Sequence, residues 1–426
     1  MIDLPAFRNA LLEHFDRTRR SLPWRSERTP YRVMVSEFML QQTRVETVIP
    51  YYERWLRRFP GWGALAEAGE DEVLRAWVGL GYYRRARNLH SAARMVREEY
   101  GGRLPEDPEA LRGLPGVGEY TAGAVASIAF GRAVPAVDGN VRRVLCRLFD
   151  LEAPTAGRLR EEAAALVDPG RPGDFNEALM ELGATVCTPG TPGCGVCPVR
   201  EWCGARVAGT VGQRPARRPR REVRRVGYVV VVVVERSAGV GEPRGPARSP
   251  RAAGNPPSAV TLVRKRPATG LLAGMWEFPS LELADDGKPG HLGLAAAATR
   301  LLGDLGVHAR PATPLHPVRH AFTHLRATYH PVICFPARPH PLPPPYAPPT
   351  PACATTPRGS RPATPVPHPT PLTIPPPVGD TAPDHPPSPT WIPLADLDDL
   401  ALPAAQRKIA ARLRTWLRDN PRQACG

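Results

Sequence analysis

The segment LPGVGEYTAG, residues 114–123, decides the fold of the N-terminal half of this chain. It lies between two stretches in which apolar residues recur at helical spacing, so it predicts a tight hairpin joining two helices. Its glycines allow another backbone to approach closely, and the helix that follows begins with free N–H groups that suit a phosphate. We therefore expect the hairpin to bind a DNA backbone rather than to serve as an inert connection. The residues expected to do so are Leu114, Gly116, Val117 and Gly118.

Helical spacing continues on both sides of this hairpin. Residues 6–15, 31–40, 45–59, 70–77, 86–99, 121–130, 141–149 and 176–182 carry it. Short runs of Gly, Pro and Asp separate these stretches, and the alternation typical of a strand is missing. We predict an all-α domain over residues 1–204.

The character of the chain changes after an Arg- and Pro-rich segment, residues 205–225, which we interpret as a linker. It is either a solvated tether or a strap that contacts phosphates. Residues 229–234 are six consecutive valines and predict a buried strand at the start of a second domain, 226–420.

Further strand-like runs at 259–264 and 327–335, with helical stretches at 292–305 and 404–417, predict an α+β fold for this domain. Two insertions, 236–258 and 336–390, are rich in proline and small residues and are predicted to be disordered.

The charge of the chain favours a polyanionic partner. Its 426 residues include 56 Lys+Arg against 41 Asp+Glu, a formal charge of +15. A G+C-rich genome explains the excess of arginine over lysine but not the sign of the net charge. The only lysines are Lys265, Lys288 and Lys408, so the predicted helical domain contains no side-chain amine.

The composition also excludes several classes of protein. No apolar run approaches the about 18 residues of a membrane-spanning helix, and the N-terminus lacks the apolar core of a signal peptide. Eight cysteines in so long a chain do not form a secreted disulfide framework. We expect a reducing cytoplasm.

Four cysteines cluster in the pattern C-x6-C-x2-C-x5-C: Cys187, Cys194, Cys197 and Cys203. Thiols so close together in a reducing compartment indicate a metal centre, either zinc or a 4Fe-4S cluster. A zinc ribbon prefers two CxxC pairs separated by a long spacer, whereas this segment has one pair and two wider gaps. The spacing favours one 4Fe-4S cluster.

The segment VDGNVRRV, residues 137–144, places Asp138 where it caps a helix. A carboxylate that accepts hydrogen bonds from helix N–H groups is expected to have a depressed pKa and to stay ionised. Such a group can stabilise a developing cation, although a plain helix cap is the alternative interpretation.

Together these motifs resemble the helix-hairpin-helix base-excision DNA glycosylases. The strings SEFMLQQT (36–43) and GLGYYRRARNL (79–89) are similar to those of the adenine DNA glycosylases, the MutY family. The resemblance is dense over about residues 20–204 and reaches the second domain in two islands, GMWEFP (274–279) and HAFTH (320–324). It implies a second, Nudix-like domain that recognises 8-oxoguanine.

The resemblance implies two catalytic carboxyl groups with different tasks. Glu37 lies among apolar helix neighbours that would raise its pKa, and by resemblance it protonates adenine at N7. Asp138 by resemblance stabilises the sugar cation, with Asn140 as its partner and Tyr120 as a hydrogen-bonding group.

Other residues match family positions that contact DNA. Trp24, Arg25 and Glu177 match positions around the extruded adenine. Gln42 and Tyr82 are similar to residues that fill the base stack when adenine leaves it. In the lesion-reading loop, Phe322, Thr323 and His324, threonine replaces the usual serine and keeps its hydroxyl.

Tyr120 occupies the position at which related bifunctional enzymes carry a lysine that forms an imine. An imine needs an amine, and residues 1–264 contain no lysine. We therefore predict a monofunctional hydrolase that leaves an intact abasic site.

The expected substrate is double-stranded DNA with an A:8-oxoguanine or A:G mispair, bound by a monomer in the cytoplasm at the nucleoid. Three alternatives are a thymine or uracil mismatch glycosylase, a non-catalytic iron–sulfur DNA-binding protein, and a Nudix hydrolase with a helical appendage. The second domain and SEFMLQQT argue against the first, and the pair Glu37 and Asp138 argues against the second. The glutamates of a Nudix hydrolase are missing after Phe278-Pro279, which argues against the third.

Overall fold

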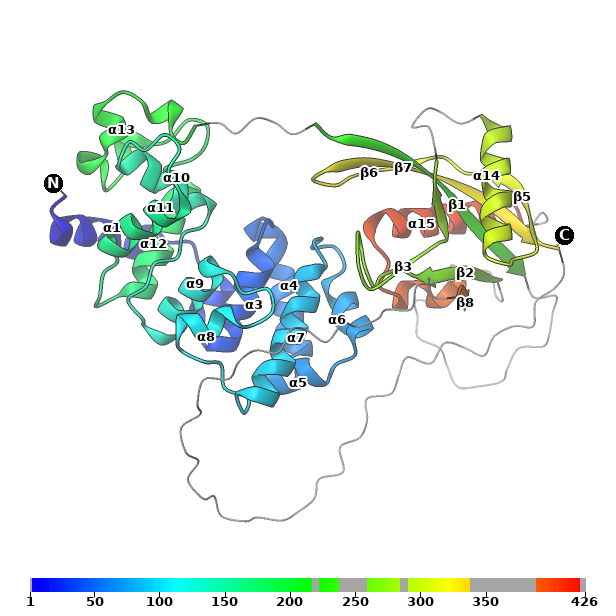
Figure 1. Ribbon diagram of the computed structural model, residues 1–426, viewed down its shortest axis with the longest axis horizontal. Coiled ribbons are helices and arrows are strands. Elements are labelled where there is room, and N and C mark those ends of the chain that lie inside the picture. The colour runs from blue at the N-terminus through cyan, green and yellow to red at the C-terminus, as the bar shows by residue number, and fades with distance from the viewer. Residues whose placement is uncertain (1, 217–221, 237–258, 284–289, 338–387, 422–426) are drawn as a thin grey trace, which may run out of the picture. The chain divides into compact units, whose positions relative to one another are not determined.

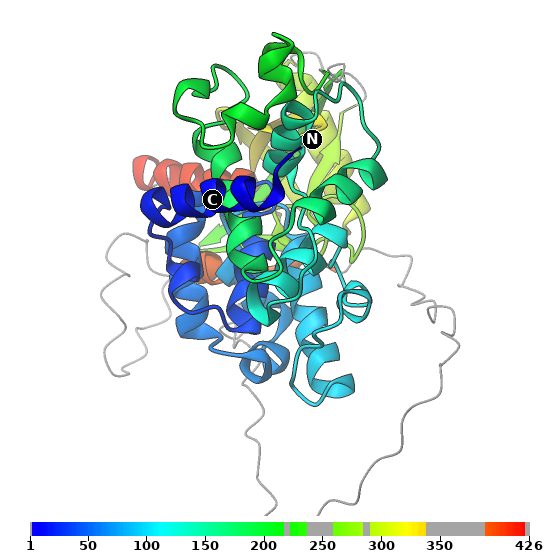
Figure 2. The ribbon, with the colours of Figure 1, turned by 90° about the vertical axis from the view of Figure 1, so that its left-hand side faces the viewer.

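The computed structural model describes residues 2–216, 222–236, 259–283, 290–337 and 388–421. The chain divides into two compact units, residues 1–222 and 223–426, and each is described by itself (Figures 1 and 2). The two expected insertions lie almost wholly outside the described residues. None of the helices described is long and apolar enough to cross a membrane.

The described part of the first unit contains helices and no strand, which confirms the all-α prediction. Asp3, Thr29, Asp107 and Thr155 each cap a helix with a side-chain oxygen. The helices are α1 Leu4–Thr18, α2 Pro23–Ser26, α3 Pro30–Leu40, α4 Val45–Arg58, α5 Trp62–Glu67, α6 Glu70–Trp77, α7 Arg84–Glu99, α8 Pro108–Arg112, α9 Glu119–Phe130, α10 Gly139–Leu148, α11 Ala156–Leu166, α12 Pro172–Thr185 and α13 Gly204–Val207, with single 3-10 turns at Cys194–Val196, Arg200–Trp202 and Val211–Gln213.

Helices α9 and α12 lie at the centre of the first unit. Helix α12 packs against α1, α9 and α10, and α9 also packs against α3. Close packing of α12 and α10 depends on Gly183, because a Cβ there would lie 2.7 Å from Cβ of Asn140. This packing brings α3, α9 and the start of α10 around one cavity.

The chain remains packed against the first unit beyond the expected domain end at residue 204. Ala205 is fully buried, and the backbone N–H of Ala216 donates to the carbonyl of Glu152 at 2.9 Å. Arg147 of α10 holds this segment, because its Nε donates to the carbonyls of Val211 and Arg214. The observed path therefore differs from the predicted linker, 205–225, in its first part.

The second unit is a mixed sheet with helices, as the α+β prediction requires. Its strands are β1 Arg224–Arg236, β2 Ala259–Lys265, β3 Trp276–Glu277, β4 Ser280–Glu282, β5 Ala309–Pro314, β6 Val318–Ala321, β7 Leu325–Pro336 and β8 Thr390–Pro393. Its helices are α14 His291–Asp304 and α15 Ala404–Asp419, with a 3-10 turn at Leu394–Asp399.

The valine run forms the centre of this sheet. Strands β1 and β7 pair in parallel, and the main path runs β3-β2-β1-β7-β5 (Figure 1). Side chains Val229 to Val234 are all at most 1% exposed, so both faces of β1 are covered. Burial on both faces explains why the run does not alternate. Helix α14 packs on the face that carries Val229, Val231 and Val233.

Candidate active site

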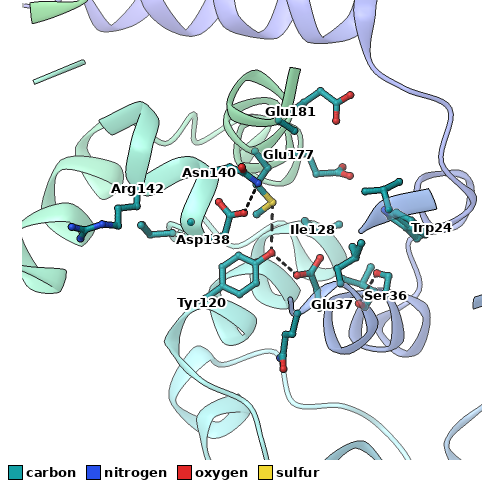
Figure 3. A pocket seen from close by; sticks show the side chains of 18 of the residues that line it. Trp24, Ser36, Glu37, Tyr120, Ile128, Asp138, Asn140, Arg142, Glu177 and Glu181 are labelled. Atoms are coloured by element: carbon teal, nitrogen blue, oxygen red, sulfur yellow. Dashed lines mark hydrogen bonds between the residues drawn. The ribbon is translucent and has the colours of Figure 1, made fainter. Parts of the chain in front are cut away.

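A cavity of about 710 Å³ opens in the first unit between α3, α9, the start of α10 and α12 (Figure 3). It brings together eight residues singled out in the sequence from five separate segments. These are Trp24, Arg25, Glu37, Gln42, Tyr120, Asp138, Asn140 and Glu177.

Glu37 lies on α3 and is 5% exposed. Its Oε2 accepts a 2.6 Å hydrogen bond from the hydroxyl of Tyr120. Burial raises the pKa of Glu37 to about 7, while the hydrogen bond from Tyr120 acts in the opposite direction. The direction matches the expectation from its apolar neighbours in the sequence.

Tyr120 lies on the first turn of α9, and its hydroxyl contacts residues of α3 and α12. Burial and the nearby carboxyl groups of Glu37 and Asp138 raise the pKa of Tyr120 well above its usual value. Its hydroxyl therefore stays protonated and donates. The hydroxyl also lies 3.7 Å from Sδ of Met180, a contact that no motif in the sequence indicated. Figure 3 shows the Tyr120 side chain between Glu37 and Asp138.

Asp138 caps α10, as the sequence predicted. Its Oδ1 accepts from the backbone N–H of Val141 at 2.7 Å, and its Oδ2 accepts from Nδ2 of Asn140 at 2.9 Å. The prediction of a depressed pKa was wrong. Burial raises the pKa of Asp138, and the hydrogen bonds from Val141 and Asn140 oppose that rise without reversing it.

Asn140 is held in turn by Arg143, which sequence reasoning missed. Nη2 of Arg143 donates to Oδ1 of Asn140 at 2.9 Å and to the carbonyl of Gly183 at 2.7 Å. Because Arg143 occupies the amide oxygen of Asn140, the amide nitrogen of Asn140 is left to face Asp138.

An ion-pair network lines the cavity where α12 borders it. Arg25 Nε donates to Glu177 at 2.9 Å, and Arg25 Nη2 donates to Glu181 at 2.9 Å. Burial acts to raise the pKa of Glu181, but hydrogen bonds from Arg20 and Arg25 hold it below its usual value. Trp24 is buried and packs edge-on against Tyr52, at 5.6 Å between ring centroids. The sequence did not single out Arg20 or Glu181.

The hairpin between α8 and α9 buries two of the residues expected to meet DNA. Leu114 and Val117 are 2% and 7% exposed, so any contact with a phosphate comes from their backbone. Gly116 has φ +77°, and a Cβ there would lie 2.6 Å from Cβ of Asn88. Gly118 precedes the first turn of α9, where backbone N–H groups lack partners within the helix.

Gln42 and Tyr82 share an unusual backbone conformation. Gln42 has φ 56° and Tyr82 has φ 47°, and both values lie in the left-handed region of the backbone, which residues other than glycine seldom adopt. Gln42 is exposed at the rim of the cavity, and the Tyr82 side chain is 45% exposed and does not line it.

The four clustered cysteines line one small cavity beside α10. Burial, reinforced by the charges of the other three thiols, raises the pKa of Cys197 to about 11. Nη1 of Arg147 donates to Sγ of Cys187 at 3.2 Å. The thiols thus share a half-buried cavity with a cation, a donor set that fits an iron–sulfur cluster. Among the described residues, no group of three or more His, Cys, Asp and Glu side chains is arranged to hold a single metal ion.

In the second unit, residues 322–324 form the turn between β6 and β7. Phe322 is half-buried, with its ring edge-on to His320 at 4.5 Å between centroids. Thr323 and His324 are exposed. The turn therefore presents two polar side chains beside an anchored aromatic ring.

Two family models match this chain in separate regions. A model of the HhH-GPD superfamily of base excision DNA repair proteins matches residues 35–169, and a NUDIX domain model matches residues 257–412. These matches confirm the predicted order of a helical glycosylase domain and a Nudix-like domain.

Known proteins resemble the chain over different extents. Adenine DNA glycosylase of Rattus norvegicus is 42% identical over 368 residues, covering 77% of this chain and 70% of that protein. Adenine DNA glycosylase of Mycolicibacterium smegmatis is 47% identical over 215 residues, covering 50% of this chain and 73% of that protein. A solved thermostable thymine-DNA glycosylase superposes with a TM-score of 0.46 at 32% identity, covering 48% of this chain and 97% of that one.

Proposed function

The chain belongs to the adenine DNA glycosylases of base excision repair, and we propose that it hydrolyses adenine from A:8-oxoguanine and A:G mispairs without cleaving the strand. The observation that carries this proposal is the cavity that holds two carboxyl groups, Glu37 and Asp138, on either side of Tyr120.

Glu37 is the proton donor in this proposal. With its pKa raised to about 7, a substantial fraction of Glu37 is protonated at neutral pH, as a general acid requires. Because Tyr120 already donates to Oε2, the proton that Glu37 gives to N7 of adenine sits on Oε1. Protonated adenine is a better leaving group, and its departure leaves a positive charge on the sugar.

Asp138 stabilises that positive charge. The cation that forms beside the carboxyl group lowers the pKa of Asp138 again, so the anion is favoured as the bond breaks. The hydrogen bonds from Val141 and Asn140 keep both carboxylate oxygens in place and add no positive charge of their own.

Hydrolysis rather than imine formation follows from the residues available. The described residues that line the cavity include no lysine, and Tyr120 offers only a hydroxyl. Without an amine, water completes the reaction: its oxygen bonds to the sugar carbon, the bond to adenine is broken, and the proton that water loses returns to the carboxylate of Glu37, so the product is an intact abasic site.

Further residues act in binding under this proposal. Trp24, Arg25 and Glu177 contact the extruded adenine, and Gln42 and Tyr82 fill the base stack. The N–H groups after Gly118 bind a phosphate. The Phe322-Thr323-His324 turn reads 8-oxoguanine through the Thr323 hydroxyl, and the Nudix-like domain recognises the lesion without hydrolysing nucleotides. The enzyme acts as a monomer at the nucleoid, where its substrate is found.

Cys187, Cys194, Cys197 and Cys203 hold one 4Fe-4S cluster in this proposal. Such a cluster would tie the loop 187–203 to α10 and so support the segment that carries Asp138. Purified protein with about four iron and four sulfide per chain and no zinc would support this cofactor. Stoichiometric zinc without iron would overturn it.

One assay tests the activity. The protein is incubated with duplexes carrying a single A:8-oxoguanine, A:G, T:G or U:G pair, with and without borohydride. We expect free adenine from the first two duplexes, strands that break only after alkali, and no trapped adduct. Release of thymine or uracil without adenine would refute the substrate, and nicking with a trapped adduct would refute the monofunctional mechanism.

A further inference from the structure

Two loops of the first unit meet at a buried arginine. One loop follows α3 and carries Gln42, and the other precedes α7 and carries Tyr82. Arg85, on the first turn of α7, is 7% exposed and lies beside both. Neither the carboxyl chemistry nor the binding roles above make use of it.

The guanidinium of Arg85 donates to backbone carbonyls in the last turn of α3, which leads into the first loop, and in the second loop. Nη1 donates to the carbonyls of Phe38 and Met39, at 2.7 and 2.8 Å. Nη2 donates to the carbonyls of Leu80 and Gly81, each at 3.2 Å.

The acceptors lie close to the two left-handed residues. Nη2 of Arg85 also donates to Oγ1 of Thr43 at 2.9 Å, so its partners bracket Gln42. The backbone N–H of Arg85 donates to the carbonyl of Tyr82 at 2.9 Å. Arg85 therefore makes a hydrogen bond next to each of the two residues with a left-handed φ, Gln42 and Tyr82.

No carboxylate among the described residues pairs with this cation. Its charge is met by carbonyl oxygens and by the rings of Trp77 and Tyr82, whose centroids lie 5.2 and 5.6 Å from Cζ. Burial lowers the pKa of Arg85 to about 10, which still leaves it charged at neutral pH. Burying a charge without a counter-ion lowers the stability of the fold, so we expect the arginine at this position to have a function.

We propose that Arg85 is a positioning residue that holds the Gln42 and Tyr82 loops at one fixed separation, so that both side chains enter the base stack together. The inference rests on the proposed role of Gln42 and Tyr82 in DNA. Fixing both loops beforehand lowers the entropy lost when adenine is extruded, because neither loop has to order on the DNA.

An arginine suits this task better than a lysine. Its planar fork offers two nitrogens, Nη1 for the carbonyls of residues 38–39 and Nη2 for Thr43 and the carbonyls of residues 80–81. A lysine side chain is one atom shorter and ends in a single nitrogen with three N–H bonds, so it cannot replace all five bonds that Nη1 and Nη2 make. Arg85→Lys therefore keeps the charge and loses part of this bridge.

The test measures base extrusion directly. A 2-aminopurine placed next to the target adenine brightens when adenine leaves the stack, and stopped-flow fluorescence follows this step in the full-length protein. For Arg85→Lys we expect extrusion at least 10-fold slower and the single-turnover rate reduced to match, with affinity for undamaged duplex changed less than 3-fold. On an adenine in a bulge, which is already unpaired, the loss of rate should shrink to less than 3-fold.

Two further variants keep the test decisive. Thr43→Val removes one Arg85 bond, together with the long 3.4 Å bond from the Thr43 hydroxyl to the carbonyl of Gln41, without disturbing the charge, and should slow extrusion about 3-fold. Arg94→Lys is the matched control, because exposed Arg94 lies on the same helix and, within the part of the chain that the structure describes, its side chain donates only to the carbonyl of Ala66, at 3.4 Å. It should extrude adenine at the wild-type rate.

The outcomes separate this inference from the proposed roles of the loops. Gln42→Ala and Tyr82→Ala should each slow extrusion. If neither does, their role in the stack fails and the inference fails with it. If both slow extrusion but Arg85→Lys and Thr43→Val match wild type, only the inference is overturned. An equal loss on paired and bulged adenine would also overturn it, since that would indicate a general structural defect.

Discussion

Glu37 and Asp138 face one cavity but belong to different kinds of backbone position. Glu37 lies within α3, among buried side chains, and accepts one hydrogen bond from Tyr120. Asp138 lies at the N-terminus of α10 and accepts two, from Val141 and Asn140. Burial raises the pKa of both groups.

This difference suits the two roles that we propose within one cavity, an acid and an anion. Glu37 has a single donor to its charged form, so little opposes the rise in its pKa, as the proposed proton donor requires. Asp138 has donors on both oxygens, which oppose the rise and favour the anion that the proposed mechanism needs. Substitutions of Glu37, Asp138 and Tyr120 change one side of the pair at a time.

The largest effect is expected from Glu37→Gln. Glutamine keeps the shape and can accept from Tyr120, but it cannot give a proton, so the single-turnover rate should fall about 10⁴-fold. A duplex carrying 7-deazaadenine, which has no N7, should bind wild type and resist cleavage. Cleavage of that duplex at the normal rate would show that protonation occurs elsewhere.

Asp138→Asn should cost somewhat less, about 10³-fold in the single-turnover rate. The asparagine oxygen can still accept from Val141 and cap α10, but the new amide nitrogen then faces the amide nitrogen of Asn140, so the melting temperature should fall modestly while the protein stays folded. Full turnover by this variant would remove the charge of Asp138 from the mechanism.

The stability of the fold should respond to Glu37 with a defined sign. Its pKa rises from 4.5 to about 7 on folding, so the folded state holds the proton more tightly than the unfolded chain. Wild type therefore loses stability as pH rises through this window, by about 3 kcal/mol in all. In denaturant unfolding, the free energy of unfolding of Glu37→Gln relative to that of wild type should rise by about 3 kcal/mol between pH 4 and 8. A difference independent of pH would contradict the raised pKa.

The smallest effect is expected from Tyr120→Phe. Loss of the hydroxyl removes the hydrogen bond that lowers the pKa of Glu37, so the alkaline fall in rate should move to higher pH. A pH–rate profile under single-turnover conditions measures it. A shift to lower pH would mean that Tyr120 stabilises the protonated form instead.

The sequence indicated much of this site because its motifs are local. The string around Glu37 predicted its burial, and the segment 137–144 predicted the cap made by Asp138. The sign of the pKa shift at Asp138 escaped prediction, because it depends on how the packed unit buries the carboxyl group, which the local pattern around Asp138 does not reveal.

Other features could not be derived from local pattern at all. The left-handed φ of Gln42 and Tyr82 has no signal in residue type, since neither is glycine or asparagine. The partners of Arg85 lie up to 47 positions away in the chain. In the second unit the buried valine strand was evident, whereas short strands such as β3 and β8 depend on their neighbours for definition.

In the proposed mechanism Glu37 supplies the proton and Asp138 the negative charge, and the pH dependence of the single-turnover rate separates these two roles. The single-turnover rate of adenine release is followed from pH 5 to pH 9 in wild type, Glu37→Gln and Asp138→Asn. We predict that the rate of wild type falls above about pH 7, where Glu37 loses its proton. The rate of Asp138→Asn should fall at somewhat lower pH, because the charge of Asp138 helps to raise the pKa of Glu37, and the residual rate of Glu37→Gln should show no such fall. The same alkaline fall in Glu37→Gln would contradict the account, because the titrating acid would then be another group.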